Sequence, residues 1–354
     1  MRLEKRHTQS ALALVLAPVG AVAFTMLVSA LLVLWAGAPV TQTYGLLLQG
    51  GFGSVFALSE TFTRAIPLML TGLAATVAFK ARLFNIGAEG QLYAGALAAV
   101  AVGGMHGGTG FDQVPLPVLF LLMLLAAALA GALLLLGPAL MKARLGVDEV
   151  VTTLLLNFIV LLLVSMVLDG PMKDPTAMGW PQSVGLIGDL ELSKLVPQTR
   201  VHTGLLWGVG LALAVWALMK YTVLGFDIRA VGANSRAAAF AGVSVTRTVV
   251  LVAMLSGALA GLAGAIEVAG RTGYVTLDMS PGYGYSGIVI AMLAALHPLG
   301  VVLASIFVAG VLVGADSMSR AIGVPTYIAD VIVAASLLSV LVATLLTQYR
   351  VRWK

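Results

Sequence analysis

The sequence predicts an all-α, polytopic membrane protein, a single bundle of about ten transmembrane helices (range about eight to ten) that occupies residues 1–354. Of the 354 residues, 60% are hydrophobic and 10% are charged, and the mean hydropathy is +1.03. Soluble domains are usually about half apolar and a quarter charged. Because apolar runs of bilayer length recur along the whole chain, almost no room remains for a soluble catalytic domain.

The predicted helices follow from apolar segments of about 20 residues, the length that crosses about 30 Å of hydrocarbon at about 1.5 Å per residue. We place them at residues 11–35, 61–79, 86–105, 115–140, 149–168, 203–219, 248–268, 284–296, 299–318 and 327–347. The sequence HPLG follows the short eighth segment, so residues 284–318 could form two helices, a re-entrant pair or one kinked helix. Residues 44–58 are apolar but interrupted by glycine, which predicts a short helix at the membrane interface.

The N-terminal sequence MRLEKRHTQS and the apolar residues after it resemble a secretory signal. The hydrophobic core of a signal is about 7 to 15 residues long, whereas the apolar stretch at 11–35 covers about 25 positions. We therefore interpret this stretch as the first transmembrane helix.

Positive charges predict the orientation, because Lys and Arg favour the cytoplasmic connections. If the helices alternate, five cationic segments fall on one side: Arg2, Lys5 and Arg6; Lys80 and Arg82; Lys142 and Arg144; Lys220, Arg229, Arg236 and Arg247; and Arg350, Arg352 and Lys354. This pattern predicts that both termini are cytoplasmic, that 220–247 is the largest cytoplasmic loop and that 169–202 is the largest extracytoplasmic loop. The exceptions to it are Lys173, Lys194, Arg200, Arg271 and Arg320. We interpret the net charge of +5 as a topology signal and expect no nucleic-acid partner.

Familiar catalytic motifs are absent from the sequence. It contains no Cys, which excludes disulfides, thiolate nucleophiles and Cys-based metal sites. It also lacks the GxxxxGK[ST] phosphate loop, HExxH and GxSxG, so it encodes neither an ATPase nor a familiar hydrolase. We expect no catalytic residue, metal ligand or cofactor in this chain; if ATP drives the protein, another chain binds it.

The predicted cytoplasmic loop contains a capped helical sequence, GFDIRAVGANSRAAAFAGVSVTR at 225–247. Asn234 or Ser235 suits the N-cap, strong helix formers follow, and Gly242 suits the position just after the helix. We therefore predict a short helix between two turns. Such a helix can dock in a groove of a soluble partner; the alternative is a connecting loop with an incidental helical turn.

Polar residues mark the start of the third predicted helix, in KARLFNIGAEGQLYAGALAA at 80–99. Asn85, Glu89 and Gln91 occur where this apolar helix begins. Because a charge near the bilayer is costly, Glu89 should face a partner or a water-filled substrate path rather than lipid. The alternative is an interfacial carboxylate that reaches the headgroups or pairs with Arg82.

The fifth predicted helix also carries polar groups, in GVDEVVTTLLLNFIVLLLVSMVL at 146–168. Thr153 and Asn157 are four residues apart and therefore share one helix face. They could line the substrate path together with Asn85, Glu89 and Gln91. The alternative is that they form hydrogen bonds between helices.

Two further patterns concern packing and coupling ions. The sequence SGALAGLAGAIEVAG, from Ser256, is rich in small residues and predicts close helix packing. Glu267, Asp316 and Asp330 lie near predicted helix ends, whereas a proton relay needs ionisable groups near the midplane.

Four segments of the chain resemble the permease subunits of bacterial ABC importers for nucleosides, which are related to those for ribose and other simple sugars. In chain order they are LFNIGAEGQLYAGALAA; VDEVVTTLLLNFI; RAVGANSRAAAFAGV, followed by SGALAGLAGA; and GYGYSGIVIAMLAALHPLG. The similarity extends from about residue 60 to about residue 345 and includes most of the chain.

The resemblance implies a division of labour among several chains. This chain would pair with a second homologous permease, with a cytoplasmic ATP-binding protein that holds ATP and Mg, and with an extracytoplasmic substrate-binding lipoprotein. The assembly would lie in the cytoplasmic (inner) membrane of a bacterium. The predicted loop helix would be the coupling helix that rests in a groove of the ATPase, and the coupling-loop residues would be Arg229, Gly232, Asn234, Arg236, Ala238, Ala239 and Gly242.

The function that the resemblance implies is ATP-driven import of nucleosides, with purine nucleosides or related bases as the expected substrates. Alternatives of the same architecture are permeases for ribose, simple sugars or branched-chain amino acids. An ion-coupled secondary transporter is a different class, which would act as a single chain and would need ionisable residues near the midplane. Gradient-driven uptake by the isolated chain would favour that class.

Overall fold

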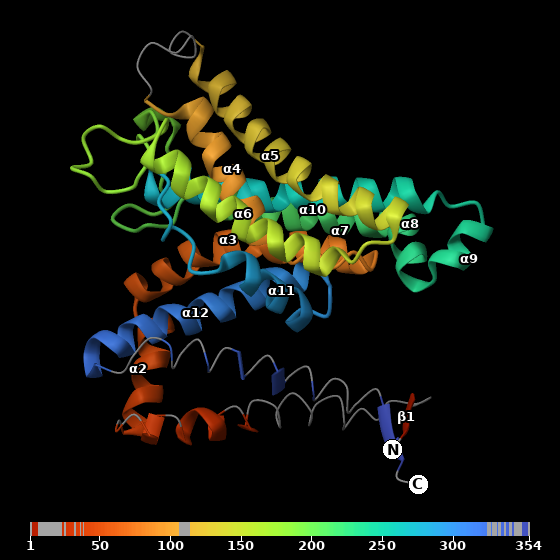
Figure 1. Ribbon diagram of the computed structural model, residues 1–354. Helices are drawn as coiled ribbons and strands as arrows, with labels where there is room; N and C mark the ends of the chain where they lie inside the picture. The colour runs from red at the N-terminus through yellow and green to blue at the C-terminus, as the bar shows by residue number, and fades with distance from the viewer. Residues whose placement is uncertain are drawn as a thin grey trace. The chain divides into compact units, whose positions relative to one another are not determined.

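The computed structural model describes residues 2–5, 23–105 except 25, 32, 36 and 38, residues 114–323 and 349–352, and the single positions 327, 331, 334, 335, 338, 339 and 342. The chain divides into two compact units, Met1–Thr61 with Ile306–Lys354, and Phe62–Ser305. Helices dominate both units (Figure 1). The predicted helices at 11–35 and 327–347, and Asp330, lie largely or wholly outside the described residues.

The first unit contains helix α2 (Val40–Phe52), the start of α3 (Val55–Lys80) and the later part of α12 (Pro298–Ile322). A Cβ atom at Gly51 would overlap the backbone of Gly310, so α2 and α12 touch without intervening side chains. The exception to the helical fold in the described part of this unit is a pair of short antiparallel strands, β1 (Arg2–Lys5) and β2 (Tyr349–Arg352).

The predicted interfacial helix at 44–58 is divided in the structure. Helix α2 ends at Phe52, and α3 begins at Val55. Local capping explains the division, because Gly53 ends α2 and the Ser54 hydroxyl accepts a hydrogen bond from Ala57 N–H (3.0 Å) at the start of α3. The prediction of one helix there was wrong, since residues 55–58 belong to α3.

The second unit contains most of the helices. They are α4 (Ala88–Gly103), α5 (Leu116–Leu145), α6 (Glu149–Asp169), α7 (Gly204–Tyr221), α8 (Val223–Ala233), α9 (Ser235–Phe240), α10 (Val245–Glu267) and α11 (Tyr283–Leu293), with parts of α3 and α12. Every helix predicted between residues 61 and 318 is present. Within the described residues, six helices are long and apolar enough to cross a bilayer: α3, α5, α6, α7, α10 with the π-helical segment η3 (Val268–Thr272), and α12. The protein is therefore a multi-pass membrane protein.

The structure excludes one continuous kinked helix over residues 284–318, because the chain is broken between α11 and α12. Helix α11 has only 11 residues, too few to cross a bilayer. Ala295 and Leu296 then adopt left-handed backbone conformations, with φ of 49° and 58°, before α12 begins at Pro298. Non-glycine residues rarely adopt positive φ, so this break is a defined feature of the chain.

The core of the second unit is formed by α4, α5 and α10, which approach one another at glycines. A Cβ atom at Gly95 of α4 would overlap the backbone of Gly261, and one at Gly131 of α5 would overlap the backbone of Gly257. Both partners belong to the small-residue sequence of α10. The close packing predicted for this sequence is thus confirmed, and it fixes α10 between two neighbours.

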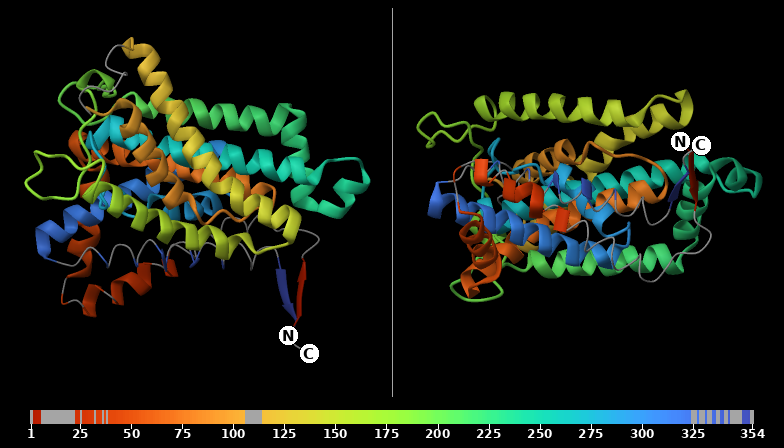
Figure 2. Two further views of the ribbon diagram at one scale, coloured as in Figure 1. Left: turned by 45° about the horizontal axis from the view of Figure 1, so that its top comes forward. Right: turned by 90° about the horizontal axis from the view of Figure 1, so that it is seen from below.

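Helix α10 connects two contrasting ends of this unit. The α8–α9 turn precedes it at one end, and the irregular 170–203 segment lies at the other (Figures 1 and 2). Backbone hydrogen bonds join this segment to residues 269–275: Ser183 N–H to Val275 O (3.0 Å), Leu186 N–H to Gly273 O (2.8 Å) and Leu192 N–H to Ala269 O (2.8 Å). The long loop is consequently fastened to the chain that follows α10.

Candidate functional site

Three polar features of the second unit are candidates for function. The first is the polar layer, defined as Asn85, Glu89, Gln91, Thr153, Asn157 and Ser256. The second is the loop pocket, a cavity at the end of α10 beside the 170–203 segment. The third is the α8–α9 knob, defined as residues 222–244, which include α8 and α9 and lie at the other end of α10.

In the polar layer, Asn85 connects the segment between α3 and α4 with α10. Its amide donates to Gln91 Oε1 (2.9 Å) and Ser256 Oγ (3.1 Å), and its Oδ1 accepts from Gln91 Nε2 (2.9 Å). The Ser256 hydroxyl donates to Ala74 O in α3 (2.8 Å). These bonds therefore join α3, α4 and α10 in a continuous network.

Thr153 and Asn157 connect α6 with the start of α4. Ile86 N–H donates to Thr153 Oγ1 (3.2 Å), and Gly90 N–H donates to Asn157 Oδ1 (2.8 Å). The Asn157 amide donates to Ile86 O (2.8 Å) and Tyr285 Oη (3.1 Å). Asn157 thus satisfies a backbone N–H that the first turn of α4 leaves without a partner, and Thr153 satisfies one just before that helix.

Glu89 faces the N-terminus of α11. Its Oε2 accepts from Gly284 N–H at 2.6 Å, where the helix dipole favours a negative group. One turn later, Tyr93 donates its hydroxyl proton to Leu277 O, and Ser280 N–H donates to Tyr93 (3.3 Å). Two side chains of α4 therefore hold the segment that leads into α11.

The structure thus brings together the five residues predicted for the substrate path, and each is at most 3% exposed. All of them have hydrogen-bond partners within the protein. Their role in a substrate path stays a prediction; what the structure shows is that they join helices. A nearby contact was not predicted: Glu149 pairs with Lys142 and accepts from Phe84 N–H (3.0 Å).

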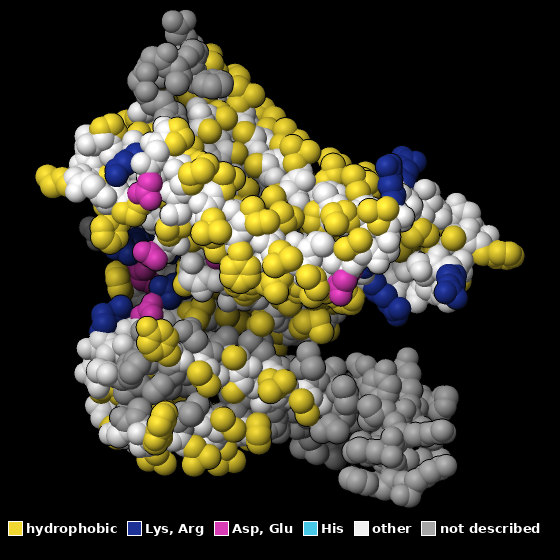
Figure 3. All heavy atoms as spheres, viewed as in Figure 1, with side chains coloured by type: hydrophobic (Ala, Val, Ile, Leu, Met, Phe, Trp, Pro, Cys, Tyr) yellow, Lys and Arg dark blue, Asp and Glu magenta, His cyan; other side chains and the backbone are white. Residues whose placement is uncertain are grey.

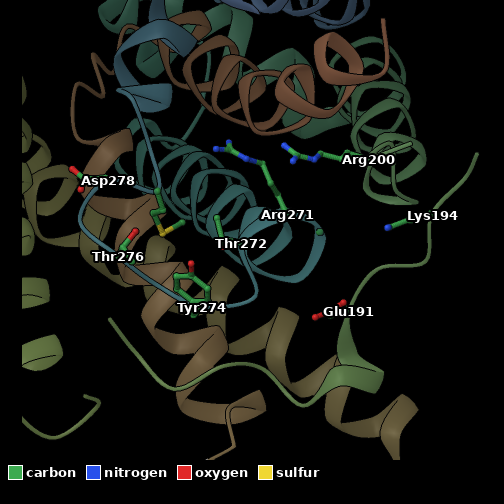
Figure 4. Close-up of a pocket in the computed structure, with 10 residues that line it drawn as sticks. Glu191, Lys194, Arg200, Arg271, Thr272, Tyr274, Thr276 and Asp278 are labelled. Carbon is green, nitrogen blue, oxygen red and sulfur yellow. The ribbon is translucent and has the colours of Figure 1, made fainter. Parts of the chain in front are cut away.

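The loop pocket has a volume of about 530 Å³, and three segments contribute its walls: the 191–200 part of the long loop, residues 270–272 of η3, and residues 274–279. In Figure 4, Arg200 and Arg271 lie on one side of the pocket, Tyr274 and Thr276 on another, and Glu191 and Asp278 at opposite ends. The sequence carries only one signal for this site: Lys194, Arg200 and Arg271 are exceptions to the charge pattern.

The wall of the pocket at η3 is fixed by buried groups. Arg271 Nη1 donates to Glu267 Oε1 (2.6 Å) and to Tyr283 Oη (2.8 Å). The imidazole of His202, which is 1% exposed, packs against Gly270, where a Cβ atom would overlap the ring. Its Nδ1 accepts from Gly204 N–H (3.2 Å), and burial lowers the pKa of His202 to about 4. The ring is therefore neutral at pH 7.

The α8–α9 knob confirms the predicted loop helix and corrects its surroundings. Asn234 Oδ1 accepts from Arg236 N–H and Ala237 N–H (both 3.1 Å), and Gly242 follows α9 with φ of 88°. A second helix, α8, occupies residues 223–233, where a turn was predicted. Its start is stabilised by Thr222, whose hydroxyl accepts from Gly225 N–H (3.1 Å).

The coupling-loop residues differ in their exposure. Arg229, Asn234, Arg236, Ala239 and Gly242 are exposed. Ala238 is 5% exposed, and Gly232 packs against the end of α3. Phe240, which was not predicted, is 97% exposed. Lys and Arg side chains gather over this end of the unit, whereas hydrophobic side chains cover much of α5 and α6 (Figure 3).

The chain matches a known family of proteins. The family described as "Branched-chain amino acid transport system / permease component" matches residues 57–341. The chain belongs to this permease family. The permease is 34% identical to the guanosine ABC transporter permease protein NupP of Bacillus subtilis (strain 168), over 92% of each chain.

Two further relatives of the permease extend the comparison. It is 36% identical to the glucose ABC transporter permease protein TsgB13 of Haloferax volcanii, over 99% of this chain and 93% of that one. It is 31% identical to the nucleoside ABC transporter permease protein NupB of Lactococcus lactis subsp. cremoris, over 91% and 89%. The chain is thus an ABC transporter permease subunit, a transport component of a larger machine.

Proposed function

We propose that this permease is the membrane-spanning subunit of an ATP-driven importer that carries nucleosides, purine nucleosides foremost, across the cytoplasmic membrane of a bacterium. The observation that carries the proposal is the similarity to the guanosine permease over 92% of both chains. The nucleoside permease of L. lactis supports the same substrate class.

A sugar is the second candidate substrate. The glucose permease is 36% identical to this chain and matches it over 99% of its length. Since nucleosides and sugars both contain a polyhydroxylated ring, the two classes share a chemical feature that a transport path can recognise.

The proposed assembly includes a second homologous permease, an ATP-binding protein that holds ATP and Mg, and an extracytoplasmic substrate-binding lipoprotein. In this scheme, nucleotide-driven motion of the ATP-binding protein reaches the membrane helices through the α8–α9 knob. The knob leads directly into α10, which begins at Val245 and packs closely on α4 and α5, and this continuity supports the route.

Reconstituted transport tests the substrate. The full importer in proteoliposomes, with its binding protein and ATP, should accumulate labelled guanosine, and unlabelled adenosine should compete more strongly than glucose, ribose or leucine. Stronger competition by glucose or ribose would establish the sugar alternative. Uptake driven by an ion gradient, with the permease alone, would overturn the ATP-driven mechanism.

The contact of the knob with the ATP-binding protein is best tested at Phe240. An exposed aromatic side chain beside Arg236 resembles the anchor residues that dominate protein interfaces. We expect Phe240→Ala to weaken binding of the ATP-binding protein by about tenfold or more. Phe226→Ala, on the exposed surface of α8, is the matched control. Equal binding by both variants would exclude Phe240 as the anchor.

A further inference from the structure

We propose that the loop pocket binds the polyhydroxylated ring that nucleosides and sugars share, and that it is a substrate site on the permease itself. This inference rests on the proposed function, since it selects the ligand class from the two candidate substrates. The pocket has a volume of about 530 Å³, within the range of about 300 to 1,000 Å³ typical of small-molecule sites. The segments that line it lie at the end of α10 opposite the α8–α9 knob (Figure 1).

The balance of charge in the pocket favours a neutral ligand. Lys194, Arg200 and Arg271 contribute positive charges, and Glu191 and Asp278 contribute negative ones. Glu267, which does not line the pocket, also pairs with Arg271. An anion would gain little from a lining whose charges nearly cancel. A hydroxyl group both donates and accepts hydrogen bonds, so a ring with several hydroxyls can use donors and acceptors of both charges.

Three cations of the pocket lining lie at the end of the helices where the charge pattern predicts few cations. Lys194, Arg200 and Arg271 are among the few cations that the charge pattern places on the extracytoplasmic side. Cations on that side oppose the usual topology signal. Their convergence on one cavity, from a loop and from η3, links these exceptions to a single site (Figure 4).

The walls of the pocket are held in place before any ligand arrives. Glu267 and Tyr283 fix Arg271. Backbone hydrogen bonds fix the loop wall on either side of Lys194: Leu192 N–H donates to Ala269 O (2.8 Å), and Thr203 N–H donates to Ser193 O (2.9 Å). Arg271 and Thr272 belong to a π-helical segment, a conformation frequent at functional sites. Preorganised walls reduce the entropy lost on binding.

Two side chains of the lining suit a sugar ring in particular. Thr272 Oγ1 is buried and, among the described residues, has no hydrogen-bond partner. A buried hydroxyl without a partner is unfavourable. Rotation of the Thr272 side chain about χ1 would bring its hydroxyl to the cavity that the residue lines, where a ligand hydroxyl would complete its bonds. Tyr274 is 39% exposed beside it, and its ring offers an apolar face to the C–H groups of a sugar.

Saturation-transfer NMR tests this site with weakly binding probes. The sample is the assembled importer in lipid nanodiscs, without the substrate-binding partner, and the probes are guanosine, glucose and 2′,3′-dideoxyguanosine. We expect transfer to the ring protons of guanosine and glucose. The dideoxy compound, which lacks the vicinal hydroxyls, should give a signal at least about fivefold weaker. Transfer to guanosine alone, or to glucose alone, would show that the pocket does not recognise the feature that the two classes share, and would overturn the inference.

Variants assign the signal to the pocket. Thr272→Val and Tyr274→Ala should each weaken it by about fivefold, whereas Tyr221→Ala, an exposed tyrosine at the knob end, should leave it unchanged. Co-elution of the permease with its ATP-binding protein in size-exclusion chromatography shows that the variants are assembled. Equal signals from guanosine and its dideoxy analogue, or signals that neither pocket variant changes, would overturn the inference.

Two outcomes separate this inference from the proposed function. Normal ATP-driven guanosine uptake without any saturation transfer would overturn the substrate site and leave the importer function intact. Failure of uptake for every nucleoside and sugar would overturn the proposed function. Pocket variants that alter only the affinity for the substrate-binding partner would show that the pocket is a docking surface, which also overturns the inference.

Discussion

The polar layer and the loop pocket both consist of polar side chains but use them in different ways. In the polar layer, amides and hydroxyls of α4, α6 and α10 bind one another and the backbone, and every member is buried. In the loop pocket, charged and hydroxyl groups surround an open cavity of about 530 Å³. Polar residues within membrane helices therefore do not by themselves mark a path, because hydrogen bonds between helices use the same residue types.

Among the substitutions that test this difference between the two regions, Asn157→Ala should have the largest effect on stability. The change leaves the buried Gly90 N–H and the half-buried Ile86 O without their partner, and each unsatisfied group costs about 1 to 3 kcal/mol. We expect the free energy of unfolding to fall by about 4 kcal/mol. It is measured by denaturant titration of the permease in lipid nanodiscs.

The control is Leu155→Ala, an exposed position of the same helix, which should change stability by less than about 0.5 kcal/mol. If Asn157→Ala retains its stability but abolishes uptake, Asn157 acts in the substrate path and the contrast between the two regions fails.

The next effect concerns pH and a residue beside the loop pocket. The pKa of His202, beside the loop pocket, is about 4 in the folded protein and 6.5 ordinarily. Between these pH values the unfolded chain binds a proton at His202 that the folded chain does not. Stability should consequently decrease as pH falls from about 6.5 to about 4, by up to about 3 kcal/mol.

Unfolding of the wild type and of His202→Gln at pH 7 and pH 5 measures this contribution. The variant should lose less stability than the wild type between the two pH values, because Gln does not titrate. The same loss in both proteins would show that other groups set the pH response.

A smaller effect is expected for Thr153→Val in the polar layer. The change removes the acceptor of Ile86 N–H (3.2 Å) and the donor to Glu149 O (2.6 Å). We expect unfolding free energy to decrease by about 1 to 2 kcal/mol, as measured by the same titration.

The smallest effect is expected for the equivalent change in the pocket, Thr272→Val. The Thr272 hydroxyl has no partner among the described residues, so stability should change by less than about 0.5 kcal/mol, or rise slightly. A loss as large as that of Thr153→Val would show that the hydroxyl stabilises the fold, and would remove the distinction between the two threonines.

The sequence by itself determined the features that depend on neighbouring residues. The lengths of the apolar segments predicted the positions of α3 to α7 and α10 to α12. The helix-capping preferences of Asn234 and Gly242 predicted the position of α9. Four sequence segments led to the permease family that the comparison then established. Local signals failed at residues 44–58 and at α8, where a single Ser or Thr cap decides between turn and helix.

Only the tertiary structure decided what the polar residues contact. Glu89 meets Gly284, 195 positions away in the chain, and Asn85 meets Ser256, 171 positions away. The walls of the loop pocket likewise come from segments separated by α7 to α10. The physical reason is that burial and capping act within one or two helical turns, whereas a hydrogen-bond partner or a cavity wall depends on which helices pack together.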